Sequence, residues 1–102
     1  MKIVSFVYSG NDGKLDPNNK DVVCTRVGEG RFQVDFNDAF KSPPAVVVGV
    51  ITHLNGWNDP LDASPDKAEV SALSKDHAFI KTWRGDNDQE ATKCFSLIAV
   101  GD

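Results

Sequence analysis

The side chains best suited to chemistry gather around a tryptophan late in the chain. Trp83 is followed directly by Arg84, and Asp86 and Asn87 come soon after it. An indole ring offers an apolar plate for the C–H face of a sugar, while guanidinium, carboxylate and amide groups bond sugar hydroxyls directionally. This combination predicts a carbohydrate-binding site. A core or interface tryptophan beside a solvated turn explains the same residues equally well, so both interpretations stay open.

The same tryptophan ends a predicted strand. Phe79, Lys81 and Trp83 are two residues apart from one another, so they share one face of that strand. The strand therefore presents two aromatic rings and an ammonium group on the same side.

A second polar segment carries the other tryptophan. Trp57, Asn58 and Asp59 belong to a stretch from 55 to 66 that is rich in turn-forming residues. Loops of this length without regular structure are often functional. We expect these three residues to contribute to the same carbohydrate site, from this chain or from a neighbouring copy.

Residues for catalysis are scarce, and we expect no enzyme. The two histidines are His53 and His77, and a hydrolase would need both to converge on a carboxylate. Cys24 and Cys94 fit neither a zinc spacing nor a Cys-x-x-Cys motif. We expect them either to form one disulfide or to serve as small buried hydrophobic residues. The sequence indicates no cofactor.

Composition excludes several classes of partner. The net charge of −4 argues against nucleic acid, which is bound by clustered lysine and arginine. No apolar run is as long as a membrane-spanning helix, and the first residues turn polar too early for a secretory leader. We expect a soluble chain of the cytoplasm or of a larger extracellular particle. The Asn/Asp-rich stretch from Ser9 has Lys20 where a calcium loop needs glutamate, so no metal is expected there.

The elements that position these residues are organised around one hydrophobic run. It follows Pro43 and Pro44, which no helix interior tolerates, and it is dense in β-branched residues from 45 to 54. We predict a central strand that is covered on both faces, by a second sheet, a loop or another subunit, because apolar residues occupy both faces. The two predicted faces are Val46, Val48 and Val50 on one side and Ala45, Val47 and Ile51 on the other.

Six further segments show strand patterns between turn clusters. The clearest alternation runs over 31–36, with Phe32, Val34 and Phe36 predicted to face inward. The other predicted strands are 2–8, 22–27, 68–73, 78–83 and 92–101. No segment shows a helical period. Seven short strands indicate an all-β fold, a single-domain antiparallel β-sandwich of six to seven strands over residues 1–102.

Three motifs resemble those of H-type lectin domains. The double proline and the aliphatic strand ending Ile51-Thr52-His53-Leu54 are similar to a family strand that ends Ile-Thr-x-Leu. Thr82-Trp83 resembles the Thr-Trp strand of the family, and 95–101 resembles its final Ser-Trp-Ile-x-Ile strand. The family includes snail agglutinins and the C-terminal domain of discoidins, and similar domains serve as knobs on phage tail fibres.

The resemblance implies a β-sandwich that trimerises and binds N-acetylgalactosamine-type sugars at subunit boundaries. Trp83 matches the sugar-contacting tryptophan of the family. Other positions differ, since Glu69 stands where those lectins carry arginine, Ala91 lies near their tyrosine and Leu97 replaces their closing-strand tryptophan.

We therefore expect a lectin module that works as a homotrimer or hexamer, in which several weak sites act together. Its ligands are expected to be galactose- or N-acetylgalactosamine-type glycans. The alternative is a structural trimerisation or capping domain of a fibre or capsid with no sugar site. The resemblance to a trimeric family implies that the outer face of the hydrophobic strand is covered by the same strand region of two other subunits. The predicted binding residues are Trp83, Arg84, Asp86, Asn87, Trp57, Asn58 and Asp59.

Overall fold

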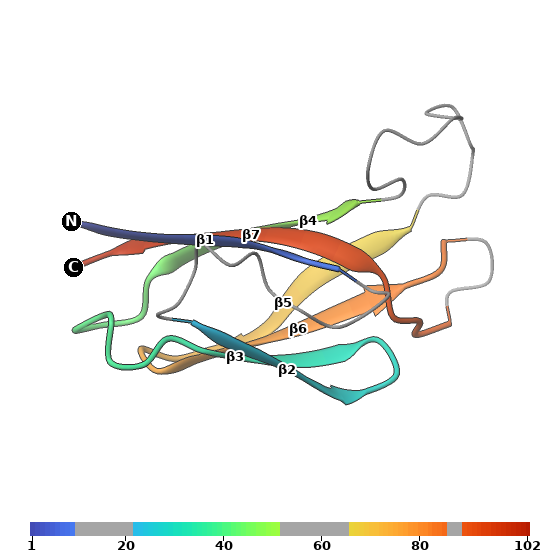
Figure 1. The fold of residues 1–102 in the computed structure, drawn as a ribbon, viewed down its shortest axis with the longest axis horizontal. Helices are drawn as coiled ribbons and strands as arrows, with labels where there is room; N and C mark the ends of the chain where they lie inside the picture. Colours follow the sequence, from blue (N-terminus) through green and yellow to red (C-terminus); the bar gives the residue numbers. More distant parts are fainter. Residues whose placement is uncertain (10–21, 52–65, 86–88) are drawn as a thin grey trace.

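The computed structural model describes residues 1–9, 22–51, 66–85 and 89–102. Within these ranges seven strands form two antiparallel sheets that pack face to face (Figure 1). The three-stranded sheet has the order β1-β7-β4, and the four-stranded sheet has the order β2-β3-β6-β5. Among the described residues there is no helix, and hence none that could span a membrane. The predicted all-β sandwich is confirmed.

The strand bounds follow the alternation in the sequence closely. They are β1 Lys2–Tyr8, β2 Val23–Gly28, β3 Arg31–Asp35, β4 Ala45–Ile51, β5 Lys67–Leu73, β6 His77–Trp83 and β7 Cys94–Gly101. β7 begins later than predicted because the two preceding residues bond elsewhere. The Thr92 amide donates to Glu29 Oε1 at 3.0 Å, and the Lys93 amide donates to Thr82 Oγ1 at 3.3 Å.

The core lies between the two sheets. Phe32, Val34 and Phe36 are completely buried, as the alternation predicts, whereas Gln33 and Asp35 between them are partly exposed. Among the described residues the buried hydrophobic side chains are Val4, Phe6, Tyr8, Val22, Phe32, Val34, Phe36, Phe40, Ala78, Ile80, Phe95, Leu97 and Ala99. Each sheet therefore contributes one face to the core and leaves the other face outward.

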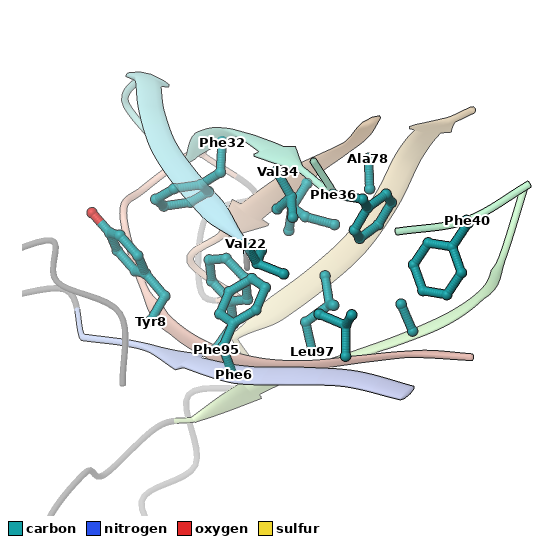
Figure 2. Packing of buried hydrophobic residues seen from close by; sticks show 13 residues of the cluster. Phe6, Tyr8, Val22, Phe32, Val34, Phe36, Phe40, Ala78, Phe95 and Leu97 are labelled. Atoms are coloured by element: carbon teal, nitrogen blue, oxygen red, sulfur yellow. The ribbon is translucent and has the colours of Figure 1, made fainter. Parts of the chain in front are cut away.

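Aromatic rings hold the sheets together at one end of the core, as Figure 2 shows. Tyr8 stacks on Phe95 with ring centroids 5.3 Å apart, and Phe32 contacts both rings at 4.6 and 5.0 Å. Phe36 and Phe40 meet edge to face at 5.2 Å further along. Replacing such a buried ring by alanine costs about 3–5 kcal/mol of stability. These rings therefore set the position of β3, which carries part of the candidate site.

The prediction that the hydrophobic run forms a central strand is wrong. β7 occupies the centre of the three-stranded sheet, and β4 lies at its edge, paired on one side only among the described residues. Val46 and Val48 pack against the core, but Val47 on the other face is 71% exposed. Strand order depends on pairing between distant segments and not on the hydrophobicity of a strand. The outer face of β4 is therefore not covered by the described part of this chain.

Candidate functional site

The outer face of the four-stranded sheet carries the residues best suited to bind a ligand. Phe79, Lys81 and Trp83 point outward from β6, whereas the residues between them are buried. The predicted common face of these three residues is confirmed. Phe79 and Trp83 are four positions apart in the chain, which places them about 13 Å apart along the strand. An ammonium group lies between them.

Polar side chains of the adjacent strands flank each of these positions. The cross-strand neighbours are Gln33 and Ala72 beside Phe79, Arg31 and Glu69 beside Lys81, and Lys67 beside Trp83. An isolated β-bridge also pairs Trp83 with Glu90. Along β6 the outer face therefore presents an aromatic, a charged and a second aromatic side chain in turn. Lys67 and Glu90 bring charges of both signs next to Trp83.

This face is hollowed beside Phe79. The depression has a volume of about 400 Å³ and is lined by Val27, Arg31, Phe32, Ser71, Ala72, Phe79, Ile80 and Lys81. Val27 and Ser71 lie at register shifts in the two edge strands, β2 and β5. Such bulges bend a strand and increase its local twist. The edge strands thus form the sides of a shallow groove whose floor is β3 and β6.

An ion pair is held beside Trp83. The Arg31 guanidinium donates from Nε to Glu90 Oε2 at 2.9 Å and from a terminal nitrogen to Glu90 Oε1 at 3.1 Å. The hydrogen bond from Arg31 is the main cause that lowers the pKa of Glu90, and the same bond raises the pKa of Arg31. The two-point geometry fixes the orientation of both groups. Glu90 is therefore a fixed, ionised acceptor at this end of the face.

The segment that carries Glu90 is anchored by a buried threonine. Thr82 is completely buried, and its hydroxyl donates to the Ala91 carbonyl and accepts the Lys93 amide. Gly30 adopts a φ of 70° at the β2–β3 turn, and its carbonyl accepts the Thr82 amide at 2.9 Å. A side chain at Gly30 would lie 2.5 Å from the Thr82 carbonyl oxygen, so the close approach requires glycine.

The buried Asp66 carboxylate anchors the backbone of Gly85, the residue after Arg84. The Asp66 side chain is only 6% exposed and contacts Lys93 Nζ at 3.2 Å. It also accepts the backbone amide of Gly85 at 3.3 Å, while the Arg84 amide donates to the Gln89 carbonyl at 2.8 Å. Residues on both sides of 86–88 are therefore attached to the body of the domain.

Two of the predicted binding residues fall within the described structure. Trp83 is partly buried at the end of β6, and Arg84 is exposed directly after it. The predicted site residues that lie outside the described residues are Asp86, Asn87, Trp57, Asn58 and Asp59. Sequence reasoning missed Arg31 and Glu90, which are far apart in the chain and have no local signal that pairs them.

The histidine and cysteine predictions have mixed outcomes. His77 lies across from Asp35, with 3.8 Å between Nε2 and Oδ2, at the end of β6 away from Trp83. His53 lies outside the described residues. Cys24 and Cys94 are both thiols, so the disulfide alternative is excluded. Burial raises the pKa of the Cys24 thiol to about 12, in keeping with a small hydrophobic residue that packs against the core.

In the described part of the chain, no three His, Cys, Asp or Glu side chains gather where they could hold a metal ion. Residues 10–20 of the segment weighed for calcium are outside that part. Comparisons with protein-family models, curated proteins and solved structures find no match to this chain. The function is therefore inferred from the geometry of the outer face.

Proposed function

We propose that this domain is a non-enzymatic carbohydrate-binding module whose ligand lies on the outer face of the four-stranded sheet. The observation that supports this proposal is the row of Phe79, Lys81 and Trp83 on β6, beside a groove and between flanking polar side chains. Aromatic plates with directional polar groups around them are what a glycan requires. No other described surface combines both features.

Trp83 is the main stacking surface in this proposal. Its ring is attached to the last residue of a strand, and the neighbouring segment is held by the buried Thr82 and Asp66 side chains. Anchoring the backbone next to Trp83 reduces the conformational entropy that the site loses when a sugar stacks on the indole. The motif that resembles the H-type lectins places Trp83 in the same role, which favours a galactose- or N-acetylgalactosamine-type sugar at this end.

The polar groups next to Trp83 supply the directional bonds. Glu90 is ionised and oriented by Arg31, and Lys67 lies on the opposite side of Trp83. Carboxylates accept hydrogen bonds from sugar hydroxyls, and ammonium groups donate to them. A hydroxylated ring seated on the indole would thus meet an acceptor on one edge and a donor on the other.

The groove extends the site beyond one sugar ring. Phe79 lies about 13 Å from Trp83, and the depression beside it is lined largely by apolar atoms, with Lys81 and Arg31 at the rim. Because this distance exceeds the length of one sugar ring, a unit further along a longer oligosaccharide, and not the adjacent one, can contact Phe79 while the first stacks on Trp83. We expect oligosaccharides to bind more tightly than the monosaccharide of the same terminal sugar.

A glycan array followed by titration tests the proposal. We expect binding of galactose- or N-acetylgalactosamine-terminated glycans, and Trp83→Ala should weaken it by at least about tenfold, because anchoring aromatic residues dominate binding energy. Phe79→Ala should weaken oligosaccharide binding and leave monosaccharide binding unchanged. Ile3→Ala, at the exposed β1 edge of the opposite sheet, is the matched control and should change neither.

The proposal is overturned if no simple sugar at millimolar concentration binds, or if Trp83→Ala binds as well as the unaltered chain. Near-equal losses for Trp83→Ala and Ile3→Ala would also contradict it, because Ile3 is exposed on the outer face of the other sheet. Each variant is first checked by circular dichroism and thermal unfolding, so that a misfolded protein is not counted as a non-binder.

A structural assembly domain of a fibre or capsid is the second candidate. It is favoured by the exposed outer face of the three-stranded sheet, where Val47, Ile98 and Ile3 are 71%, 50% and 61% exposed. Tryptophan fluorescence separates the two functions. A sugar-dependent change that Trp83→Phe removes supports the binding module, and its absence supports the assembly domain.

A further inference from the structure

Among the described residues, one edge of β4 has no strand paired to it. β4 pairs with β7 along its whole length, and within the described residues no backbone hydrogen bond joins its other side to a neighbouring strand. β5 belongs to the other sheet; it lies close to β4, but no ladder joins the two strands. An edge strand of this kind presents a row of unpaired amide and carbonyl groups.

β4 also lacks the features that protect sheet edges. Its register with β7 is regular, and none of its residues is charged or proline. Each of the other three edge strands carries charge, namely Lys2 in β1, Arg26 in β2, and Lys67 and Glu69 in β5. β2 and β5 are in addition bulged. Charges and bulges are the usual means of blocking edge-to-edge pairing, and β4 alone among these edges has neither.

The outer face next to this edge is also uncharged. Its outward positions, taken from the register of β1, β7 and β4, are Ile3, Ser5, Val7, Cys94, Ser96, Ile98, Val100, Ala45, Val47, Gly49 and Ile51. The outer face of the other sheet, by contrast, carries Arg31, Asp35, Lys67, Glu69 and Lys81. A face without charge provides nothing to attract a partner of opposite charge, and it lets two copies of an acidic chain approach without repulsion.

We propose that β4 pairs antiparallel with β4 of a second copy of this chain, centred on Val48, so that the two three-stranded sheets join into one sheet of six strands. In this register Val48 faces the partner's Val48, and Val46 faces the partner's Val50. On the outer face Val47 lies opposite the partner's Gly49, and Ala45 lies opposite the partner's Ile51. Each outer pair thus joins a large residue to a small one.

Gly49 is the residue that argues most strongly for pairing with a second copy of the chain. Among the described residues, a side chain added there would meet Ser96 Oγ alone, at 3.7 Å, which is an ordinary contact, and its φ is not positive. The described part of one chain therefore does not require glycine at this position. Glycine inside a strand weakens the strand and often marks a place where another backbone approaches closely. The pairing supplies that approach, since the partner's Val47 covers Gly49.

The dimer is expected to be weak. Seven paired residues extend about 24 Å, and pairing along one edge buries less than the roughly 800 Å² per partner of a stable interface. We expect a micromolar dissociation constant, so monomer and dimer should exchange within the range of concentrations that sedimentation equilibrium covers. The pairing is independent of the proposed glycan site, which lies on the other sheet, and it stands whether or not a sugar binds.

Sedimentation equilibrium from about 1 μM to about 1 mM tests the pairing. The unaltered chain should fit a monomer–dimer equilibrium, and Val47→Lys should raise the dissociation constant about 5- to 30-fold, because each dimer loses two cross-strand valine contacts and gains two neighbouring positive charges. Ile3→Lys is the matched control, since it adds the same charge to an exposed position of the same face but at the β1 edge. It should change the dissociation constant less than twofold.

A trimer, or a monomer throughout the concentration range, would overturn the proposal. So would equal weakening by Val47→Lys and Ile3→Lys, which would indicate that copies pack through the faces of their sheets. Circular dichroism and thermal unfolding of both variants confirm that the fold is intact before the comparison is made.

Cysteine cross-linking tests the register without depending on the strength of the dimer. Under mild oxidation a mixture of Val47→Cys and Gly49→Cys chains should cross-link faster than either variant alone, because only the mixture places the two new thiols directly opposite each other. The native thiols are the same in all three samples and serve as the internal control. Equal cross-linking in all three samples would overturn the register centred on Val48.

Discussion

Thr82 offers the sharpest test of how the candidate site is held in place. It is completely buried, its hydroxyl donates to the Ala91 carbonyl, and the same oxygen accepts the Lys93 amide at 3.3 Å. Thr82→Val keeps the shape and the β-branching but removes both hydrogen bonds. Two partly buried backbone groups then lose their partner, which costs about 2–3 kcal/mol of unfolding free energy.

Thr82→Ser is the matched control for this change. Serine keeps the hydroxyl and loses one buried methyl group, which costs about 1 kcal/mol. The valine variant should therefore be the less stable of the two, although it is the closer match in volume. For a domain of this size the valine substitution should lower the melting temperature by about 10–20 °C.

Urea unfolding monitored by circular dichroism measures both variants against the unaltered chain, with the slope of the transition checked for constancy. A valine variant as stable as the unaltered chain, or more stable than the serine variant, would refute the reasoning. Either result would mean that packing of the methyl group, and not the two hydrogen bonds, keeps the 91–93 segment on β6.

Three other predictions follow from the same region and from the core. Gly30→Ala should destabilise the domain by more than about 2 kcal/mol, because it combines a positive φ with a backbone clash, and thermal unfolding equal to that of the unaltered chain would contradict this. The pKa of Glu90 is lowered in the folded state by Arg31, so the stability that the pair contributes is fully present above the ordinary glutamate pKa and is lost as pH falls through the lowered value. The difference in urea midpoint between the unaltered chain and Glu90→Gln should accordingly shrink on acidification, whereas a constant difference from neutral pH to pH 2 would exclude a contribution from ionised Glu90. The Cys24 thiol, with its pKa raised to about 12 by burial, should react with iodoacetamide at pH 8 far more slowly in the folded protein than in urea, and equal rates, read by mass spectrometry of the peptide, would contradict its burial.

The strands and their inward faces could be predicted from the sequence because alternation is a local property of the chain. Phe32, Val34 and Phe36 are two residues apart, so any strand that contains them must place all three on one face. The same reasoning places Phe79 and Trp83 together on the outer face of β6. Local patterns thus determined the β-sandwich, the core and the aromatic part of the candidate site.

The order of the strands was not predictable in the same way. The most hydrophobic run, 45–54, was predicted to be central, yet β4 lies at an edge. Hydrophobicity on both faces of a strand shows that both faces avoid water, but it does not show whether the cover comes from the same chain. In the described part of the chain the outer face of β4 is exposed and one of its edges has no strand paired to it, and the proposed pairing with a second copy would cover that edge.

The sequence alone determined where strands run and which of their residues turn inward, because those features depend on neighbours two residues away. Only the tertiary structure placed Glu90 beside Arg31 and required Gly30 at the β2–β3 turn, because these contacts join segments that are about sixty residues apart. Such contacts follow from the pairing of whole strands, and no short stretch of sequence contains them. The polar half of the candidate site, Arg31 and Glu90, therefore depends on the tertiary structure, whereas its aromatic half, Phe79 and Trp83, follows from the local sequence.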